Sequence, residues 1–431
     1  MPQRTQHPQP HARGRLGRVS WALYDWANSS FAAIISTFVF PAYFARQVAE
    51  NETLGTAYWG QTVGIAGLLV ALCAPLLGAI ADRSGRRKPW IALFTLLCVL
   101  ATGALWWITP DSRSILPAML LAGLATLAAE FAEVFYNAML PSLTRYDRLG
   151  RWSGWAWGLG YAGGIGSLLL ALFGFVQEQA WFDLPRTGSE HVRATFVLVA
   201  VWYAVFALPL FLFTPDETTK PMALARAARE GLTQLRDSIR QVRAYAPLLR
   251  FLLARLLFID GLATIFTFGG VYAAGTFGMN EERVLLFGIA LNVTAGLGAA
   301  AFAWIDDRFG SKRTILISLV GLIIPGSLLL VVESTTLFWV FGMLLGIFVG
   351  PVQAAGRSYL ARTAPIHLRN QMFGLFAFSG KATAFLGPLL VGWITAWYGS
   401  QRAGMSVIIL LLLAGFLVML SVPEEGREAE S

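Results

Sequence analysis

The segment that decides the fold reads Gly78-Ala-Ile-Ala-Asp82-Arg83-Ser-Gly85-Arg86-Arg87-Lys88. It lies between two apolar runs, at 57 to 81 and at 89 to 109. Each run has the roughly 20 apolar residues that an α-helix needs to cross a bilayer core of about 30 Å. The segment is therefore a short, strongly basic loop between two membrane-spanning helices.

Apolar runs of this size recur along the 431-residue chain, which is 56% apolar and only 13% charged. Ordinary soluble domains carry about 25% charged residues. The sequence thus predicts an all-α integral membrane protein with twelve transmembrane helices in two six-helix bundles. The runs cover 21 to 45, 57 to 81, 89 to 109, 114 to 140, 153 to 177 and 193 to 214, then 249 to 275, 284 to 305, 314 to 332, 335 to 356, 371 to 397 and 403 to 421.

A polar stretch separates the two groups of six, and the domain organisation follows from it. The expected units are a basic cytoplasmic N-terminus (1–20), an N-terminal bundle (21–214), a cytoplasmic linker (215–248), a C-terminal bundle (249–421) and an acidic tail (422–431). The linker has an amphipathic pattern that is typical of a short helix lying along the membrane surface. A partner-binding role is the alternative for the linker.

The positive charges are distributed unevenly between the two sides of the membrane. If the N-terminus is cytoplasmic, 25 of the 33 Lys and Arg residues fall on the cytoplasmic side, six fall on the other side, and Arg255 and Lys381 lie within helices. Loops rich in Lys and Arg stay in the cytoplasm. We therefore expect both termini to be cytoplasmic, in a protein of the bacterial inner membrane.

The basic loop resembles the signature G-x-x-x-D-R-x-G-R-R-[KR] of the major facilitator superfamily, and a weaker copy begins 225 residues later. Such repetition is expected of a transporter built from two duplicated halves. The resemblance implies that a carboxylate among arginines forms ion pairs that close the cytoplasmic side; mere anchoring of the topology is the alternative. The expected gating residues are Gly78, Asp82, Arg83, Gly85, Arg86, Arg87, Asp307 and Arg308.

A second, narrower resemblance covers most of the chain. Its motifs are Trp21-Ala-Leu-Tyr-Asp-Trp-Ala-Asn-Ser-Ser-Phe31, Tyr136-Asn-Ala-Met-Leu-Pro141, Gly158-Leu-Gly-Tyr-Ala-Gly-Gly164, Arg255-Leu-Leu-Phe-Ile-Asp-Gly261, Gln353-Ala-Ala-Gly-Arg-Ser358 and Ser379-Gly-Lys-Ala-Thr-Ala-Phe-Leu-Gly-Pro388. Together they resemble the vacuole-effluxer-like branch of the superfamily, which is related to the fungal autophagy-associated amino-acid effluxer. The resemblance implies a facilitator fold and amino-acid export by a bacterial-type member.

Ionisable residues within the predicted helices are the candidates for function, because each costs about 2.5 to 3.5 kcal/mol to place at the centre of a membrane helix. The candidates for binding the solute or coupling a proton are Asp25, Asn28, Glu130, Glu133, Arg255, Asp260 and Lys381. In the superfamily the first, fourth, seventh and tenth helices line the cavity, which implies that the four acids face it. Asp260, about twelve residues into its helix, is the strongest single candidate.

Three roles compete for these acids. A carboxyl group removed from water can carry a proton, a carboxylate can hold a substrate ammonium group, or the acids can form structural ion pairs with Arg255 and Lys381. Four acids and two bases leave two acids without a partner, so we expect at least one functional role. Asp25 also fits a position at the start of its helix, whereas Asn28 indicates a polar lining.

The remaining motifs favour transport over catalysis. Gly380-Lys381-Ala382 lacks the pattern of a nucleotide-binding loop, and the four His residues and two Cys residues form no recognisable metal or catalytic cluster. We expect a monomeric, cofactor-free transporter of a small solute in the lipid bilayer, driven by the solute's own gradient or by protons. Export of drugs, peptides or other metabolites is the alternative, and a non-transporting scaffold or receptor is a more distant one.

Overall fold

The computed structural model describes residues 13–83, 86–144, 149–216, 245–363 and 382–424, together with residues 233, 372, 376, 379 and 380. These residues form helices joined by short connections, and no β-strand occurs among them. Eleven of the helices are long and apolar enough to cross a membrane. The predicted all-helical membrane fold is confirmed.

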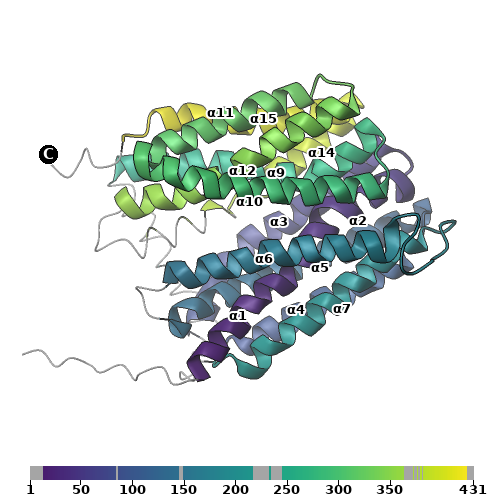
Figure 1. The fold of residues 1–431 in the computed structure, drawn as a ribbon, viewed down its shortest axis with the longest axis horizontal. Coiled ribbons are helices and arrows are strands. Elements are labelled where there is room, and N and C mark those ends of the chain that lie inside the picture. The colour runs from purple at the N-terminus through teal and green to yellow at the C-terminus, as the bar shows by residue number, and fades with distance from the viewer. Residues whose placement is uncertain are drawn as a thin grey trace, which may run out of the picture.

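The described residues of the first half form six helical segments, some of them made of consecutive helices of different type (Figure 1). The first segment is interrupted by π-helical turns, which often occur at functional sites. The segments are α1 (Arg13–Ser30) continued by η1 (Phe31–Phe38), α2 (Val39–Tyr43) and η2 (Phe44–Val48); α3 (Glu52–Arg83); α4 (Lys88–Ala104) with η3 (Leu105–Trp107); η4 (Ser112–Ser114) with α5 (Ile115–Leu143); α6 (Leu149–Ala171) with η6 (Leu172–Val176); and α7 (Glu190–Phe213).

The second half repeats this arrangement with one shortened member. Its helices are α9 (Ala246–Phe277), α10 (Glu281–Phe309), α11 (Ser311–Leu329), α12 (Thr335–Thr363), α14 (Leu386–Tyr398) and α15 (Gln401–Leu420). The predicted span 371–397 is represented by α14 alone as a continuous helix, because residues 382–385 form turns. Most of residues 371–381 lie outside the described part of the chain.

Tight connections in the second half have simple chemical causes. α9 ends at Gly278, whose φ of 63° suits a residue without a side chain. Asn280 then caps α10 by accepting a hydrogen bond from the Arg283 N–H at 3.0 Å. Between α14 and α15, Gly399 (φ 62°) ends α14 and the Ser400 side chain caps α15 by accepting a hydrogen bond from the Ala403 N–H. These local signals turn the chain back on itself within a few residues.

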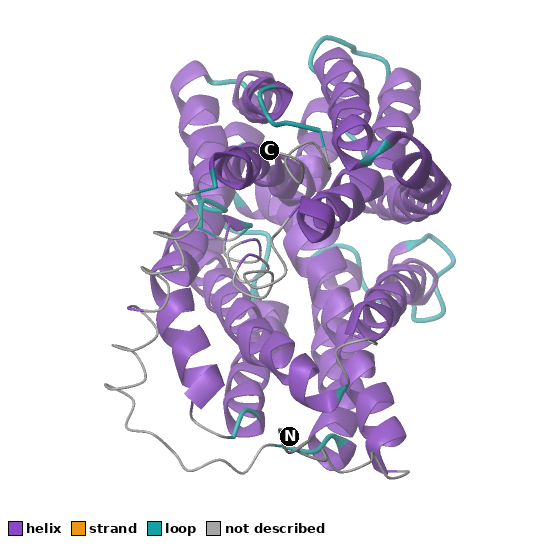
Figure 2. Ribbon diagram, turned by 90° about the vertical axis from the view of Figure 1, so that its left-hand side faces the viewer, coloured by secondary structure: helices purple, strands orange, loops and turns teal. Residues whose placement is uncertain are grey.

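The two halves lie side by side as separate helical bundles (Figure 1 and Figure 2), and α1 begins at the same end of the molecule at which α15 finishes (Figure 1). We call this the terminal end and the other the opposite end. Between the halves, α3 packs against α14, and α9 packs against η1 and α2. The bundles lean together at the opposite end and diverge toward the terminal end (Figure 1).

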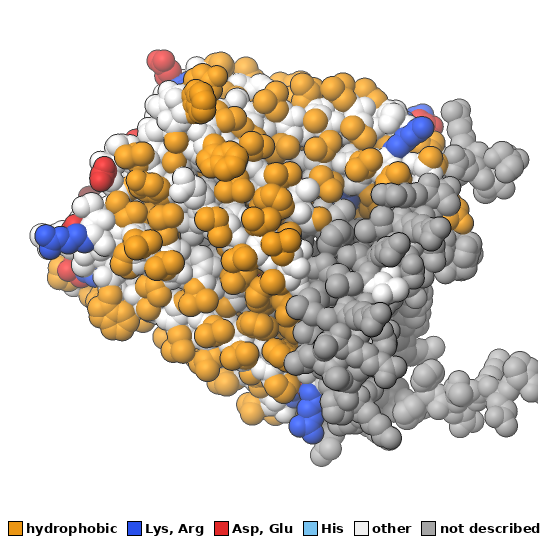
Figure 3. Space-filling model, turned by 180° about the vertical axis from the view of Figure 1, so that it is seen from behind, with side chains coloured by type: hydrophobic (Ala, Val, Ile, Leu, Met, Phe, Trp, Pro, Cys, Tyr) orange, Lys and Arg blue, Asp and Glu red, His pale blue; other side chains and the backbone are white. Residues whose placement is uncertain are grey.

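The surface matches a membrane environment. Apolar side chains cover the broad face shown in Figure 3, whereas charged ones gather at its margin. Large aromatic side chains are exposed near the opposite end, among them Trp107 (73% exposed), Trp181 (68%) and Trp397 (87%). Trp and Tyr prefer the boundary between lipid and water. The chain is therefore an integral membrane protein whose aromatic belt marks one membrane surface.

Candidate solute site and gates

Asp25 lies on α1, a helix that hydrogen bonds anchor on its other side. The buried Tyr24 hydroxyl bonds Thr95 at 2.6 Å and Tyr203 at 3.0 Å. Asp25 instead projects toward α6, where a Cβ atom at Gly160 would lie 3.6 Å from the Asp25 Cβ. The carboxyl group is half-buried and forms no ion pair with a described side chain. The side of α1 that carries Asp25 therefore lies against α6 near Gly160.

Glu133 on α5 is the neighbour of Asp25, close enough for their charges to interact. Asn137 donates a hydrogen bond to Glu133 Oε1 at 3.3 Å. The ring of Tyr136 stacks on Trp21 with centroids 4.7 Å apart, which fixes the helix face that carries the acid. α1 and α5 therefore place two carboxyl groups together, as expected if these acids belong to one site.

Two further candidates lie near this acidic pair. Glu130 is half-buried one turn before Glu133 on α5, and Asn28 is half-buried one turn after Asp25 on α1. The Asn28 Oδ1 atom has no hydrogen-bond partner within the described part of the chain. A buried amide oxygen without a partner is costly, so Asn28 fits a polar position that a bound solute or water could complete.

Arg255 on α9 is the cationic candidate of the second half whose position the structure describes. Its Nη1 donates to the Phe376 carbonyl and to Ser379 Oγ, both at 2.7 Å, and its guanidinium lies 3.5 Å from the centre of the Phe376 ring. No described carboxylate forms an ion pair with it. The structural ion pair considered for Arg255 is therefore absent among these residues, and hydrogen bonds and the aromatic ring hold the group instead.

Arg357 on α12 lies close enough to Arg255 for electrostatic repulsion and interacts favourably with Tyr161 of α6. Tyr161 belongs to the first half, so Arg357 lies near the junction of the two halves at the depth of the candidate residues. Sequence reasoning placed Arg357 in a cytoplasmic loop and missed it, because α12 continues to Thr363. Asp25 and Glu133 thus come from the first half, and Arg255 and Arg357 come from the second.

Asp260 on α9 is buried, with 3% of its surface exposed. Its carboxyl group lies against the first turn of α14, where a Cβ atom at Gly387 would come 3.0 Å from Asp260 Oδ1. The Oδ1 atom has no hydrogen-bond partner among the described atoms. Asp260 is therefore packed between α9 and α14, whereas Asp25 and Glu133 face each other from α1 and α5. Lys381 lies outside the described residues.

The signature loop is described in part. Gly85, the surroundings of Gly78 and the side chains of Asp82, Arg83 and Asp307 lie outside the described set. Arg86 is exposed, and Arg87 is 8% exposed, with Nη1 donating to Ser142 Oγ at 3.3 Å. Arg87 therefore contacts its own half in this structure.

Asp216 takes part in this loop and was not among the candidates. Its carboxylate accepts the backbone N–H groups of Arg87 at 3.0 Å and Lys88 at 3.1 Å, and so caps the start of α4. In the second copy, Arg308 is exposed, and Asp306 forms an ion pair with Arg362 at 3.6 Å. Asp216 and Asp306 both lie at helix ends. A single carboxylate at such a position is a weak sequence pattern, so the sequence predicted neither contact.

Polar contacts join the two halves at the opposite end. Arg46 donates to the Met279 carbonyl at 2.7 Å, Gln47 donates to Glu281, and Gln401 Nε2 donates to Thr56 Oγ1 at 2.7 Å. Sequence reasoning missed this group, because single polar residues at helix ends form no recognisable pattern. In this structure these side chains close the opposite end.

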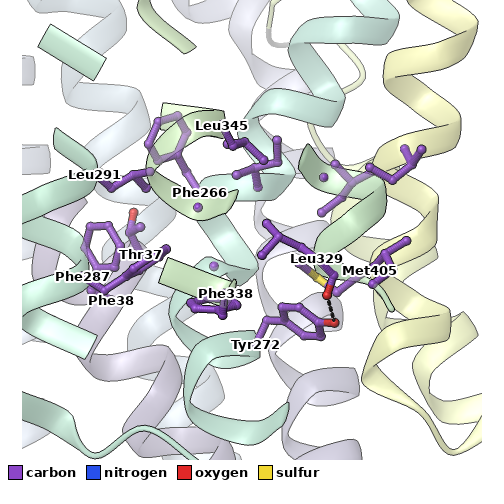
Figure 4. A pocket seen from close by; sticks show the side chains of 17 residues that line it. Thr37, Phe38, Phe266, Tyr272, Phe287, Leu291, Leu329, Phe338, Leu345 and Met405 are labelled. Carbon is purple, nitrogen blue, oxygen red and sulfur yellow. Dashed lines mark hydrogen bonds between the residues drawn. The ribbon is translucent and has the colours of Figure 1, made fainter. Parts of the chain in front are cut away.

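Phe38 is the apolar counterpart of this closure. It comes from the first half and is 1% exposed. A Cβ atom at Gly270 of α9 would come 2.7 Å from the Phe38 carbonyl oxygen, and a Cβ atom at Gly288 of α10 would come 2.7 Å from the Phe38 ring. Phe38 also borders an apolar cavity of about 60 Å³ that residues of the second half line for the most part, Phe287 and Phe338 among them (Figure 4).

Comparison with known proteins agrees with this architecture. The family model described as "Vacuole effluxer Atg22 like" matches residues 14–430. The "uncharacterized MFS-type transporter YxiO" of Bacillus subtilis is 28% identical over 94% of both chains. Autophagy-related protein 22-1 of Phaeosphaeria nodorum is 24% identical over 88% of this chain and 78% of its own length.

Solved transporters share the fold at low sequence identity. A bacterial homologue of the human lysosomal transporter Spinster, in an inward-facing conformation, has a TM-score of 0.70 and 14% identity over 96% of this chain and 98% of its own. The xylose transporter XylE of E. coli, partially occluded and inward open, has a TM-score of 0.68 and 13% identity over 96% and 99%. With its helical fold, its paired halves and these matches, the chain belongs to the Atg22-like vacuole effluxer family of major facilitator superfamily transporters.

Proposed function

We propose that this transporter moves a small zwitterionic solute, an amino acid in the first instance, out of a bacterial cytoplasm through the inner membrane. The observation that supports this substrate class is the division of charge: Asp25 and Glu133 lie on the first half, whereas Arg255 and Arg357 lie on the second. A solute with an ammonium group at one end and a carboxylate at the other complements both halves at once. Binding would then draw the halves together, as alternating access requires.

We further propose that the terminal end is the cytoplasmic end and that the structure represents the inward-facing state. The contacts of Arg46, Gln47 and Gln401 hold the opposite end together, and the halves diverge toward the terminal end (Figure 1). In the outward-facing state these contacts would separate, and the signature loops would close the cytoplasmic side through Asp82, Arg83 and Arg87.

Proton coupling is the proposed source of energy, with the solute's own gradient as the alternative. The carboxyl groups at membrane depth are the candidate proton carriers, because an unpaired charge is expensive in an apolar environment and a proton removes it. Spinster-like and xylose–proton transporters share the fold alone, so the coupling ion has to be measured on this chain.

The test is transport into proteoliposomes of the purified protein, with a pooled mixture of amino acids read by mass spectrometry, with and without an imposed pH gradient. Parallel pools of nucleosides, sugars and dipeptides test the alternative substrate classes. We expect amino-acid transport that Asp25→Asn and Arg255→Met each reduce, whereas Glu424→Gln, at an exposed ion pair with Arg313, leaves it unchanged. Transport of another pool without transport of amino acids would refute the proposed substrate class.

A further inference from the structure

The described residues just before α14 leave the helical conformation at membrane depth. Residues 380 and 382–385 form turns, and α14 begins afresh at Leu386, whose N–H donates to the Thr383 carbonyl at 2.8 Å. A helix that starts inside the membrane presents unpaired N–H groups and the positive end of its dipole there. Such helix starts form ion and substrate sites in other transporters.

Asp260 points at this helix start from α9. A Cβ atom at Gly387 would lie 3.0 Å from Asp260 Oδ1 and would collide with Thr264 Oγ1, so only a residue without a side chain lets both groups reach the first turn of α14. Thr264 Oγ1 itself donates to the Asp260 backbone carbonyl at 2.7 Å. The carboxyl group is 3% exposed, and its Oδ1 has no hydrogen-bond partner within the described residues.

No described charge compensates Asp260. The Gly387 N–H interacts with its carboxyl group, and no charged side chain of the described residues does so. On the elements packed against α9, the described charged or titratable side chains are Arg46, Glu52, Tyr58, Cys73, Arg357, Arg362, Arg402, those at the two ends of α10, Tyr43, Tyr359 and Tyr398; α9 itself adds Arg250, Arg255 and Tyr272. A proton is the simplest ligand that neutralises such a group.

Arg255 and Asp260 contact the chain on either side of the turns at residues 380 and 382–385. Arg255 bonds Phe376 and Ser379 before these turns, and Asp260 contacts Gly387 after them. Both side chains come from α9, five residues apart, which is about 7.5 Å along a helix. A shift of α14 relative to Asp260 would therefore be transmitted to Ser379 and to the guanidinium at the proposed solute site.

We propose that Asp260 is a proton-binding site outside the solute site, and that it controls the position of Arg255 through the chain that precedes α14. When the proton leaves, the carboxylate is attracted to the first turn of α14; when a proton binds, that attraction is lost. Asp260 is thus a positioning residue for Arg255 and does not itself contact the solute. The inference deepens the proposed function and rests on it for the identity of the solute, but its test needs no solute.

The experiment follows the conformation of the solute-free protein from about pH 5 to about pH 9, the range in which a buried carboxyl group can titrate. Spin labels at Ser112→Cys and Arg283→Cys, both exposed at the opposite end, report the distance between the halves. We expect a single-proton transition in the wild type that Asp260→Asn abolishes and that Asp25→Asn retains. Persistence of the transition in Asp260→Asn, or its absence in the wild type, would overturn the proposal.

Gly387→Ala is the second variant, because an added Cβ separates the carboxyl group from α14 without changing any charge. We expect it to shift the midpoint of the transition, and an unchanged midpoint would refute the link to α14. Solute exchange in liposomes at equal pH supplies a separate readout: Asp260→Asn should retain exchange while losing pH-driven accumulation. Loss of both activities in a folded Asp260→Asn variant would instead make Asp260 a solute contact.

Discussion

Phe38→Ala should open the opposite end of the transporter. Phe38 of η1 contacts the other half twice in the described structure: its ring lies against Gly288, and its backbone lies against Gly270. Separation of the halves must withdraw its ring from this position. Removal of the ring therefore destabilises the state in which the opposite end is closed more than the state in which it is open.

The magnitude follows from the burial of the ring. Phe38 is 1% exposed, and truncation of a buried Phe to Ala costs about 3 to 5 kcal/mol. Every 1.4 kcal/mol changes an equilibrium by about tenfold, so the lower figure shifts the ratio of closed to open molecules by about 100-fold. If about 99 of 100 wild-type molecules are closed at this end, the Phe38→Ala variant would have closed and open molecules in about equal numbers.

The assay is the distance between spin labels at Ser112→Cys and Arg283→Cys, in a background in which Cys73 and Cys98 are replaced by Ser. Phe338→Ala is the matched control, because Phe338 borders the same cavity and is 2% exposed but packs on Tyr272, Phe277 and Phe287 of its own half. We expect the longer distance to gain population only in Phe38→Ala. Equal opening in both variants, or in neither, would refute the reasoning.

Three further predictions test individual contacts. Arg255→Lys should weaken solute binding by about 10- to 100-fold in equilibrium binding measurements, because hydrogen bonds to charged groups contribute about 1.5 to 3 kcal/mol and lysine lacks the planar fork. Gly60→Ala should slow transport strongly, because its Cβ would lie 2.5 Å from the Pro388 carbonyl oxygen of the other half. Gly103→Ala is the control and should not slow transport, because its Cβ would lie 3.6 Å from the nearest atom. Equal transport rates in the two variants would contradict this prediction. Asp216→Ala should lower the unfolding free energy by about 0.5 to 2 kcal/mol through loss of the α4 cap, seen as a lower melting temperature, and an unchanged melting temperature would count against the cap.

Sequence patterns determined the architecture because membrane insertion is a local property. A run of about 20 apolar residues must form a helix in lipid whatever its neighbours are, since each backbone polar group has to be paired within the segment. The all-helical fold and the family were therefore readable from apolar runs and from motifs such as residues 78–88 and 255–261. The same reasoning singled out the charged residues at membrane depth, because each is expensive there.

Only the tertiary structure decided which of these charges lie together. It placed Glu133 beside Asp25, and it brought Arg357 to Tyr161 of the other half. It also turned Asp260 away from the other acids, toward Gly387. The rotation of each helix depends on side-chain packing and on π-helical turns such as those in η1, which a hydropathy pattern does not contain.

The sequence by itself determined that this chain crosses the membrane in two related halves, belongs to a transporter family and carries costly charges inside the bilayer. The tertiary structure alone decided that Arg46, Gln47, Gln401 and Phe38 close one end, that Arg255 bonds Phe376 and Ser379, and that Asp260 lies against Gly387. The physical reason is that insertion into lipid depends on short segments of sequence. Contacts between the halves depend on residues more than 200 positions apart, such as Arg46 and Met279.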